Sequence, residues 1–132
     1  MSHWKKFQAD VLKDINKDLL AKAVKDLGVE MDESIKHIRN TWGNENVNAG
    51  LVKDGRPIAL GFNFKNRNGK IELELTGDFF GTGLDERTFI DRLSQAYQKH
   101  NAVEKLEQQG WMIDELATND KGEIVIEAYQ WA

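Results

Sequence analysis

Histidine is the side chain best suited to chemistry here, because the 132 residues include three histidines and no cysteine. The missing thiols exclude disulfides, thiolate zinc sites and cysteine nucleophiles. His100 follows Tyr97 by one helical turn on an apolar stripe, where an imidazole can act as a general base or titrate near neutral pH. Asp78 is the carboxylate that would complete such a site. The pattern favours a packed histidine with one hydrogen bond, since buried polar groups normally have a partner, and leaves the reactive role open.

A metal site is the second possibility that the histidines raise. His3, His37 and His100 could meet in space and, with Asp78 or Glu72, would suit zinc or iron. No two of these histidines stand at ligand spacing within one element, which is the usual signature of such a site. The sequence therefore predicts neither a metal nor another cofactor.

Other catalytic patterns are missing or incomplete. Glu72 and Glu74 alternate on one strand, but paired carboxylates do acid–base work only in a cleft that separates their pKa values. No serine stands in a glycine-flanked nucleophile turn. The glycines of residues 77–83 lack the Gly-Lys-Ser/Thr of a phosphate loop. These patterns favour a protein that is not an enzyme.

Large aromatic residues point to contact rather than to catalysis. Trp4 and Trp42 lie near the expected ends of elements, and Phe79 and Phe80 stand in a glycine-containing loop. Aromatic side chains dominate protein–protein hot spots when exposed and hydrophobic cores when buried. We take these four as the candidates for a protein-binding surface, and we expect Trp111 to belong to the core.

Charge and length narrow the class of protein. The net charge is −4, with +2 in residues 1–27 and −6 in residues 28–132, so nucleic acid is an improbable partner and an anionic membrane surface is disfavoured. Residues 1–7 show no signal peptide or membrane span, so we expect a cytoplasmic protein, and the length fits a single domain, residues 1–132. Single-strand nucleic-acid binding would need five basic residues to converge on one face: Lys5, Lys6, Lys65, Arg67 and Lys70.

Hydrophobic periodicity predicts the elements that must position these residues. One helix is capped by Asn16 or Asp18 and ended by Gly28, and another of about 25 residues runs from Asp85 to Gly110. Strands are expected in seven segments: 3–12, 34–40, 48–52, 58–64, 71–76, 111–116 and 123–131. The long helix carries one apolar stripe, formed by Phe89, Leu93, Ala96, Tyr97, His100, Val103 and Leu106.

Tight turns indicate the fold class. Asp54-Gly55 and Asn68-Gly69 tolerate the positive φ angles of two-residue hairpin loops, so neighbouring strands must pair antiparallel. Two helices can cover only one face of such a sheet. We therefore expect an α+β fold in the order β-α-β-β-β-β-α-β-β, in which both helices pack on one face of a curved, mainly antiparallel sheet of about six to seven strands.

Several short segments carry a family resemblance in the same order along nearly the whole chain. They are Ser2-His3-Trp4, Leu27-Gly28, Leu60-Gly61-Phe62-Asn63, the helix with Phe89, Leu93, Gln95, Tyr97 and His100, Gln109-Gly110-Trp111, and Gly122 to Trp131. In these segments the chain resembles a family of small uncharacterised proteins known from cyanobacteria and plastids as hypothetical chloroplast reading frame thirty-five, with bacterial and phage relatives. It departs from that pattern at residues 39–42 and in the loop around Gly81.

The resemblance implies a fold but no settled activity, cofactor or catalytic residue. Members of that family are often encoded beside ATPases of the AAA class, which implies an accessory role. Our first hypothesis is therefore a non-enzymatic interaction module whose partner is a protein, such as an ATPase of the AAA class. The alternative is a small-molecule or enzymatic pocket between the sheet and the long helix that uses His100 with Tyr97.

Overall fold

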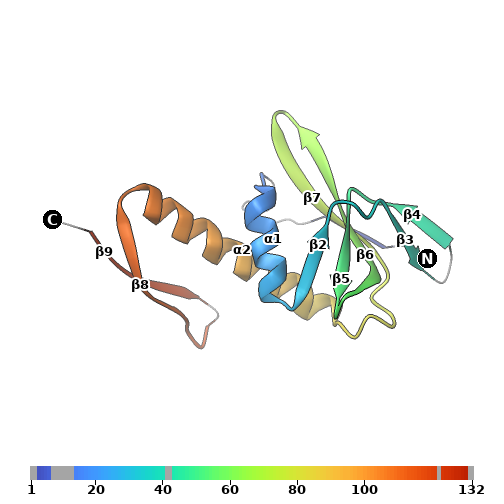
Figure 1. The fold of residues 1–132 in the computed structure, drawn as a ribbon. Coiled ribbons are helices and arrows are strands. Elements are labelled where there is room, and N and C mark those ends of the chain that lie inside the picture. Colours follow the sequence, from blue (N-terminus) through green and yellow to red (C-terminus); the bar gives the residue numbers. More distant parts are fainter. Residues whose placement is uncertain (1–2, 7–13, 41–42, 122, 131–132) are drawn as a thin grey trace.

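The computed structural model describes residues 3–6, 14–40, 43–121 and 123–130. Figure 1 shows two helices beside a twisted antiparallel sheet, which confirms the α+β prediction. The elements follow the chain as β1 His3–Lys6, α1 Lys17–Asp26, β2 Val29–Asp32, β3 His37–Asn40, β4 Gly43–Asn46, β5 Ala49–Lys53, β6 Arg56–Arg67, β7 Lys70–Gly77, α2 Glu86–Gln108, β8 Trp111–Thr118 and β9 Ile124–Gln130.

Two strands, β2 and β4, escape the sequence pattern. β2 alternates apolar and polar residues over only four positions, Val-Glu-Met-Asp, which is a short signal. β4 also has four residues, and its wholly polar sequence Gly-Asn-Glu-Asn has no apolar period at all. The expected strand at 34–40 is confirmed in its second half as β3. Of the expected first strand, 3–12, the described part is β1, and residues 7–13 lie outside the described residues.

The main sheet contains five strands in the order β1-β7-β6-β5-β2, and every neighbouring pair is antiparallel. Its two tight turns hold the dipeptides that predict them. Asp54 and Gly55 have φ of 52° and 74°, and Asn68 and Gly69 have φ of 54° and 80°. Two successive positive φ angles match the twist of the flanking strands, so these short dipeptides set the register of β5, β6 and β7.

Both helices begin and end where the sequence predicts. Asn16 caps α1 and Asp85 caps α2, each accepting hydrogen bonds from free N–H groups of the first turn. Gly28 and Gly110 follow the helix ends with φ of 79° and 87°, a region that favours glycine. None of the helices in the described residues is long and apolar enough to cross a membrane.

The main core lies between the helices and one face of the five-stranded sheet. Phe62 stands opposite Leu75 in the β6–β7 register, and both are essentially sealed from solvent. The helices contribute the facing half of this core. Its buried members are Ile15, Leu19, Leu20, Ala23, Val24, Val29, Leu51, Leu60, Phe62, Leu73, Leu75, Phe89, Leu93, Ala96 and Tyr97.

The opposite face of the sheet is covered by the β3–β4 hairpin. Gly50 and Gly61 are cross-strand partners on that face, and a Cβ atom at either would collide with the side chain above it, Ile35 over Gly50 and Val47 over Gly61. The glycine pair therefore makes room for a close approach that any larger residue would prevent. Figure 1 shows β3 and β4 on the side of the sheet away from α1.

The strands divide into three sheets instead of the single one expected. β3 pairs with β4 and β8 with β9, each as a two-stranded sheet apart from the main one. For the last hairpin the cause is α2, whose 23 residues carry the chain about 35 Å. Figure 1 shows β8 and β9 at the far end of this helix, away from the main sheet. Local sequence predicted the pairing of β8 with β9, but not its distance from the sheet.

Candidate functional site

Tyr97 is buried and serves the packing of the two helices. Its side chain is 2% exposed, and its hydroxyl oxygen accepts a hydrogen bond of 2.8 Å from the backbone N–H of Asn16, the residue that caps α1. Burial raises the pKa of this phenol above its ordinary value of 10.0, against the hydrogen bond from Asn16, which lowers it. The hydroxyl therefore stays neutral near pH 7 and links α2 to the start of α1.

His100 lies at the other end of the same helix contact. Its Nε2 is 2.7 Å from Asp26 Oδ2 in the last turn of α1, and Lys99 Nζ is 2.9 Å from the same oxygen. The His100 side chain is 23% exposed, so it is neither sealed in the core nor open in a cleft. Burial raises the pKa of Asp26, but the hydrogen bonds and charges of Lys99 and His100 outweigh this, and the pKa falls below its ordinary 3.8.

A hollow of about 240 Å³ adjoins this contact between α1, α2 and β9. Charged groups of both signs line it, including Asp26, Arg92 and Lys99, and Ile124 of β9 closes one side. Tyr97 and His100 are not among its lining residues. The two sequence candidates thus flank the packing of α1 on α2 and do not converge on a shared pocket.

Asp78 lies apart from both Tyr97 and His100, in the loop after β7. Its carboxylate accepts a hydrogen bond of 2.9 Å from the backbone N–H of Phe80, and its own N–H donates to the carbonyl of Ala59. No hydrogen bond or ion pair joins it to His100 or Tyr97 within the described residues. The described part of the chain also contains no group of three or more carboxylate or histidine side chains that could hold a metal ion.

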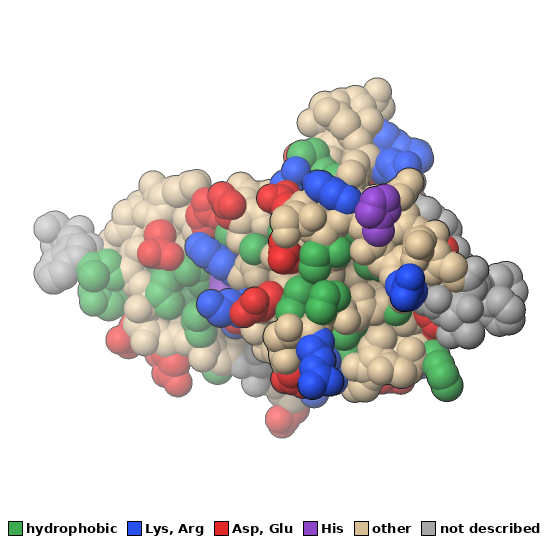
Figure 2. All heavy atoms as spheres, turned by 45° about the vertical axis from the view of Figure 1, so that its right-hand side comes forward, with side chains coloured by type: hydrophobic (Ala, Val, Ile, Leu, Met, Phe, Trp, Pro, Cys, Tyr) green, Lys and Arg blue, Asp and Glu red, His purple; other side chains and the backbone are tan. Residues whose placement is uncertain are grey.

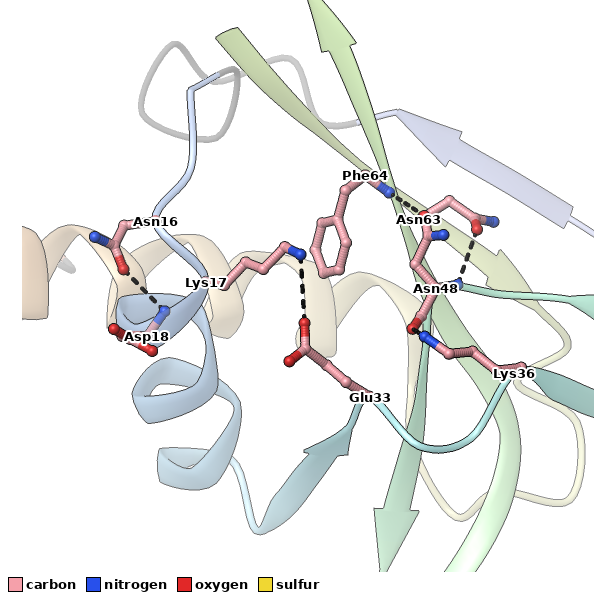
Figure 3. A network of polar contacts seen from close by, with 8 residues as sticks. All are labelled: Asn16, Lys17, Asp18, Glu33, Lys36, Asn48, Asn63 and Phe64. Carbon is pink, nitrogen blue, oxygen red and sulfur yellow. Dashed lines mark hydrogen bonds and ion pairs between the residues drawn. The ribbon is translucent and has the colours of Figure 1, made fainter.

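Polar contacts surround Phe64 of β6 and involve both α1 and the segment before β5 (Figure 3). Asn48 accepts from the backbone N–H of Phe64 at 2.7 Å, and its own N–H donates to Asn63 Oδ1 at 3.1 Å. Lys17 lies 4.8 Å from the centre of the Phe64 ring and 3.4 Å from Glu33. Because these groups bond to one another and to the backbone, the network is a structural join between elements.

The aromatic residues that the sequence suggested as a protein-binding surface lie in different environments. Phe79 is half-buried, with its ring edge-on to Phe89 at 5.8 Å, whereas Phe80 is 85% exposed. Trp4 lies in β1, where the structure describes the backbone only, and Trp42 lies outside the described residues. Trp111, expected in the core, is instead half-buried in β8, because the main core ends before that strand.

Of the five basic residues that nucleic-acid binding would need on one face, only three lie near one another among the described side chains. Lys65, Arg67 and Lys70 are exposed near the β6–β7 turn, and Arg67 is 3.3 Å from Glu72 in an ion pair. The side chains of β1 are not described. Figure 2 shows positive and negative side chains interspersed over one face of the molecule.

Most of the large apolar side chains exposed in the described part of the chain lie in a region that the sequence patterns did not single out. We call residues 98–130 the C-terminal arm: the last turns of α2 and the β8–β9 hairpin. Not one described residue of the arm is buried, although apolar residues recur along it. Among the described residues, four of the five exposed large apolar side chains belong to its hairpin, namely Met112, Leu116, Val125 and Tyr129. In Figure 2 apolar and acidic side chains lie together at the end of the molecule that bears the C-terminus.

The hairpin has two distinct faces. Its inner face includes Ile113, Ile124 and Ile126, which are half-buried, and both strands contact α2. All the residues of its outer face are exposed, and three cross-strand pairs form it: Met112 with Tyr129, Glu115 with Glu127, and Ala117 with Val125. A register shift between Ile113 and Glu115 brings the two glutamates opposite each other.

The hairpin also contains the charge imbalance of the whole chain. Residues 111–130 hold five acidic residues and one lysine, a net charge of −4, which equals the net charge of all 132 residues. The remaining residues therefore carry no net charge. The excess of acidic residues in the hairpin is a signal for this exposed surface that the sequence contains. It is not visible when the charge is summed over residues 28–132 as a whole.

Two comparisons with known proteins found a match. Residues 23–126 match the family model described as "Protein of unknown function (DUF1257)". The chain belongs to this family. It is also 25% identical over 131 residues to the uncharacterized protein ycf35 of Pyropia yezoensis, covering 99% of this chain and 98% of that one. The resemblance noted from short segments is thereby confirmed. No solved structure matches the chain.

Proposed function

We propose that this DUF1257 protein is a non-enzymatic interaction module that binds a partner protein through its C-terminal arm. The observation that supports the proposal is burial: residues 98–130 include no buried side chain among those described, while the hairpin exposes four large apolar ones. Contiguous exposed apolar surface marks interaction sites in folded proteins. A partner would supply the packing that the arm lacks.

The resemblance to the plastid reading-frame family suggests a class of partner. An ATPase of the AAA class is the partner that we propose, with this protein as its accessory subunit. The arm suits such a role because it projects from the main body and can enter a groove or extend a sheet of another protein.

A pull-down from the native host tests the arm as the binding surface. The variant Leu116→Ser with Val125→Ser removes two side chains that are 41% and 45% exposed, so it should change stability little. Phe80→Ser is the matched control, since it removes an 85% exposed apolar side chain from the loop after β7. We expect the wild type and the control to retain a stoichiometric protein that the double variant loses.

The opposite results would each be informative. Recovery of no stoichiometric protein by the wild type would contradict the interaction module itself. Loss of the partner by Phe80→Ser alone would move the binding surface to the loop that holds Phe79 and Phe80. A partner that is not an ATPase would leave the module in place and remove the AAA assignment.

A second candidate is small-molecule binding in the hollow between α1, α2 and β9. Its support is the pair of cations, Arg92 and Lys99, that lines the hollow next to Asp26. In this alternative His100 acts through Asp26, whereas Tyr97 contributes by holding the helices together. A metabolite panel that shifts the melting temperature of the wild type but not of Arg92→Ala would support it.

A further inference from the structure

We infer that the outer face of the β8–β9 hairpin binds a protein segment in which a lysine or arginine stands between two apolar side chains. The inference deepens the proposed interaction module and rests on it. Its basis is the order of the three cross-strand pairs on that face: an apolar pair, an acidic pair and a second apolar pair. Each pair presents side chains to the same side of the hairpin.

The acidic pair is the feature that favours binding of a cationic side chain. Glu115 and Glu127 face each other directly across the strands, and like charges in such positions destabilise a hairpin. Neither carboxylate has a hydrogen-bond or ion-pair partner among the residues that the structure describes. A guanidinium or ammonium group placed between them would remove the repulsion and gain two charge-assisted contacts.

The apolar pairs on either side define the rest of the segment. Met112 and Tyr129 are 38% and 45% exposed, and Val125 on the other side is 45% exposed. Side chains on one face of a strand repeat about every 7 Å. An extended segment with apolar, basic and apolar residues at alternate positions would match that spacing, with both apolar side chains leaving water.

Charge distinguishes this partner from the other molecules that could bind the same surface. A second copy of the same hairpin would bring a net charge of −4 against the −4 of the first, so the two copies repel each other. Nucleic acids and anionic membranes are repelled for the same reason. The exposed basic turn of a second copy, residues 65–70, has charge of the right sign but no exposed apolar residues to fill the flanking positions.

Selection from a random peptide library displayed on phage tests the inference on the intact chain. The bait is the wild type, and the comparison bait is Glu115→Gln with Glu127→Gln, which keeps the size of both side chains. A charge-matched control bait is Glu30→Gln with Glu107→Gln, two exposed glutamates away from the outer face. We expect wild type and control to enrich peptides with a basic residue flanked by apolar ones, and the outer-face variant not to.

A synthetic copy of an enriched peptide then gives the magnitude. Its affinity should fall about tenfold or more with the outer-face variant, the effect of losing charge-assisted contacts, and should weaken as salt is raised. Replacing Val125 by Ser should weaken the same peptide while leaving its salt dependence in place.

The outcomes separate this inference from the proposed function. Enrichment of acidic or uncharged peptides, or binding that the outer-face variant leaves unchanged, would overturn the basic–apolar segment but not the interaction module. Failure of any bait to enrich peptides would count against both. Concentration-dependent dimers in sedimentation that Glu115→Gln with Glu127→Gln abolishes would identify a second copy as the occupant and overturn the inference.

Discussion

The two halves of helix α2 follow the same apolar period but have different environments. Phe89, Leu93 and Tyr97 in the first half are buried against the main sheet, whereas Val103 and Leu106 in the second half are only partly covered. The first half shares the main core with α1 and with residues of β2, β5, β6 and β7, and the second half meets a two-stranded hairpin. An amphipathic stripe therefore indicates which side chains seek a partner, and the tertiary structure determines whether one is present.

Truncation of one leucine in each half should give the largest contrast. Leu93→Ala removes a fully buried side chain and should lower the free energy of unfolding by about 2–5 kcal/mol. Leu106→Ala acts on a half-buried side chain in the arm and should cost about 1 kcal/mol. Urea denaturation followed by circular dichroism measures both values.

Leu73→Ala is the control for the sheet side of the same core, since Leu73 is 1% exposed. It should behave as Leu93→Ala does, within the same range. Equal losses for Leu93→Ala and Leu106→Ala would show that the arm belongs to the main cooperative unit, and the contrast drawn between the two halves would be wrong.

Gly61 in the main sheet and Gly110 at the end of α2 extend the contrast, because substitution is restricted by a different cause at each position. At Gly61 the limit is space, since an added Cβ would lie 2.6 Å from Val47, and Gly61→Ala should cost about 1–3 kcal/mol through overpacking. At Gly110 there is open space but φ is 87°, so Gly110→Ala should cost about 1 kcal/mol through backbone strain. Thermal melting of each variant gives the comparison.

A second substitution at each site identifies the cause. Val47→Ala should recover part of the stability lost by Gly61→Ala, because it removes Val47 Cγ1, the atom nearest to the added Cβ, while the Ala49 carbonyl oxygen at 2.9 Å remains. Gly110→Asn should melt above Gly110→Ala, because asparagine tolerates the left-handed region better than alanine does. Absence of either difference would remove the corresponding explanation.

The hydroxyl of Tyr97 tests the contact between the helices. Tyr97→Phe keeps the ring in the core but leaves the backbone N–H of Asn16 without its acceptor, and should cost about 0.5–1.5 kcal/mol. The variant should also lose the absorbance change of a buried phenol at alkaline pH, because burial raises the pKa of Tyr97. A melting temperature equal to that of the wild type would mean that water replaces the hydroxyl at no cost.

The smallest expected effect is at Asp26, where α1 meets the start of the arm. Because the pKa of Asp26 is lowered in the folded chain, its stabilisation is present above the ordinary value of 3.8 and is lost as pH falls through the lower folded value. Its side chain is 36% exposed, so Asp26→Asn should cost no more than about 1 kcal/mol near pH 7. The difference between variant and wild type should shrink below about pH 4.

His100→Gln separates the partners of Asp26. Glutamine can still reach a carboxylate, so this variant should lose less stability near neutral pH than Asp26→Asn, which weakens the contacts of both His100 and Lys99. Melting curves of both variants from pH 3 to pH 8 give the test. A difference between Asp26→Asn and the wild type that grows as pH falls would contradict a lowered pKa for Asp26 in the folded chain.

Short-range signals in the sequence determined much of this protein. The caps Asn16 and Asp85 and the dipeptides Asp54-Gly55 and Asn68-Gly69 act through hydrogen bonds and φ angles within a few residues, so they can be predicted from the chain alone. The same is true of the α+β class, because tight turns leave only antiparallel pairing for their strands.

The candidate sites depended on contacts between residues far apart. His100 looked like a packed or a reactive group until its partner was known, and that partner, Asp26, lies 74 residues away on α1. Likewise, periodicity could not reveal that the stripe of α2 loses its cover after Tyr97, or that a register shift sets Glu115 opposite Glu127. Local chemistry in the sequence determines which groups need a partner, whereas burial and charge pairing depend on which surfaces the tertiary structure brings together.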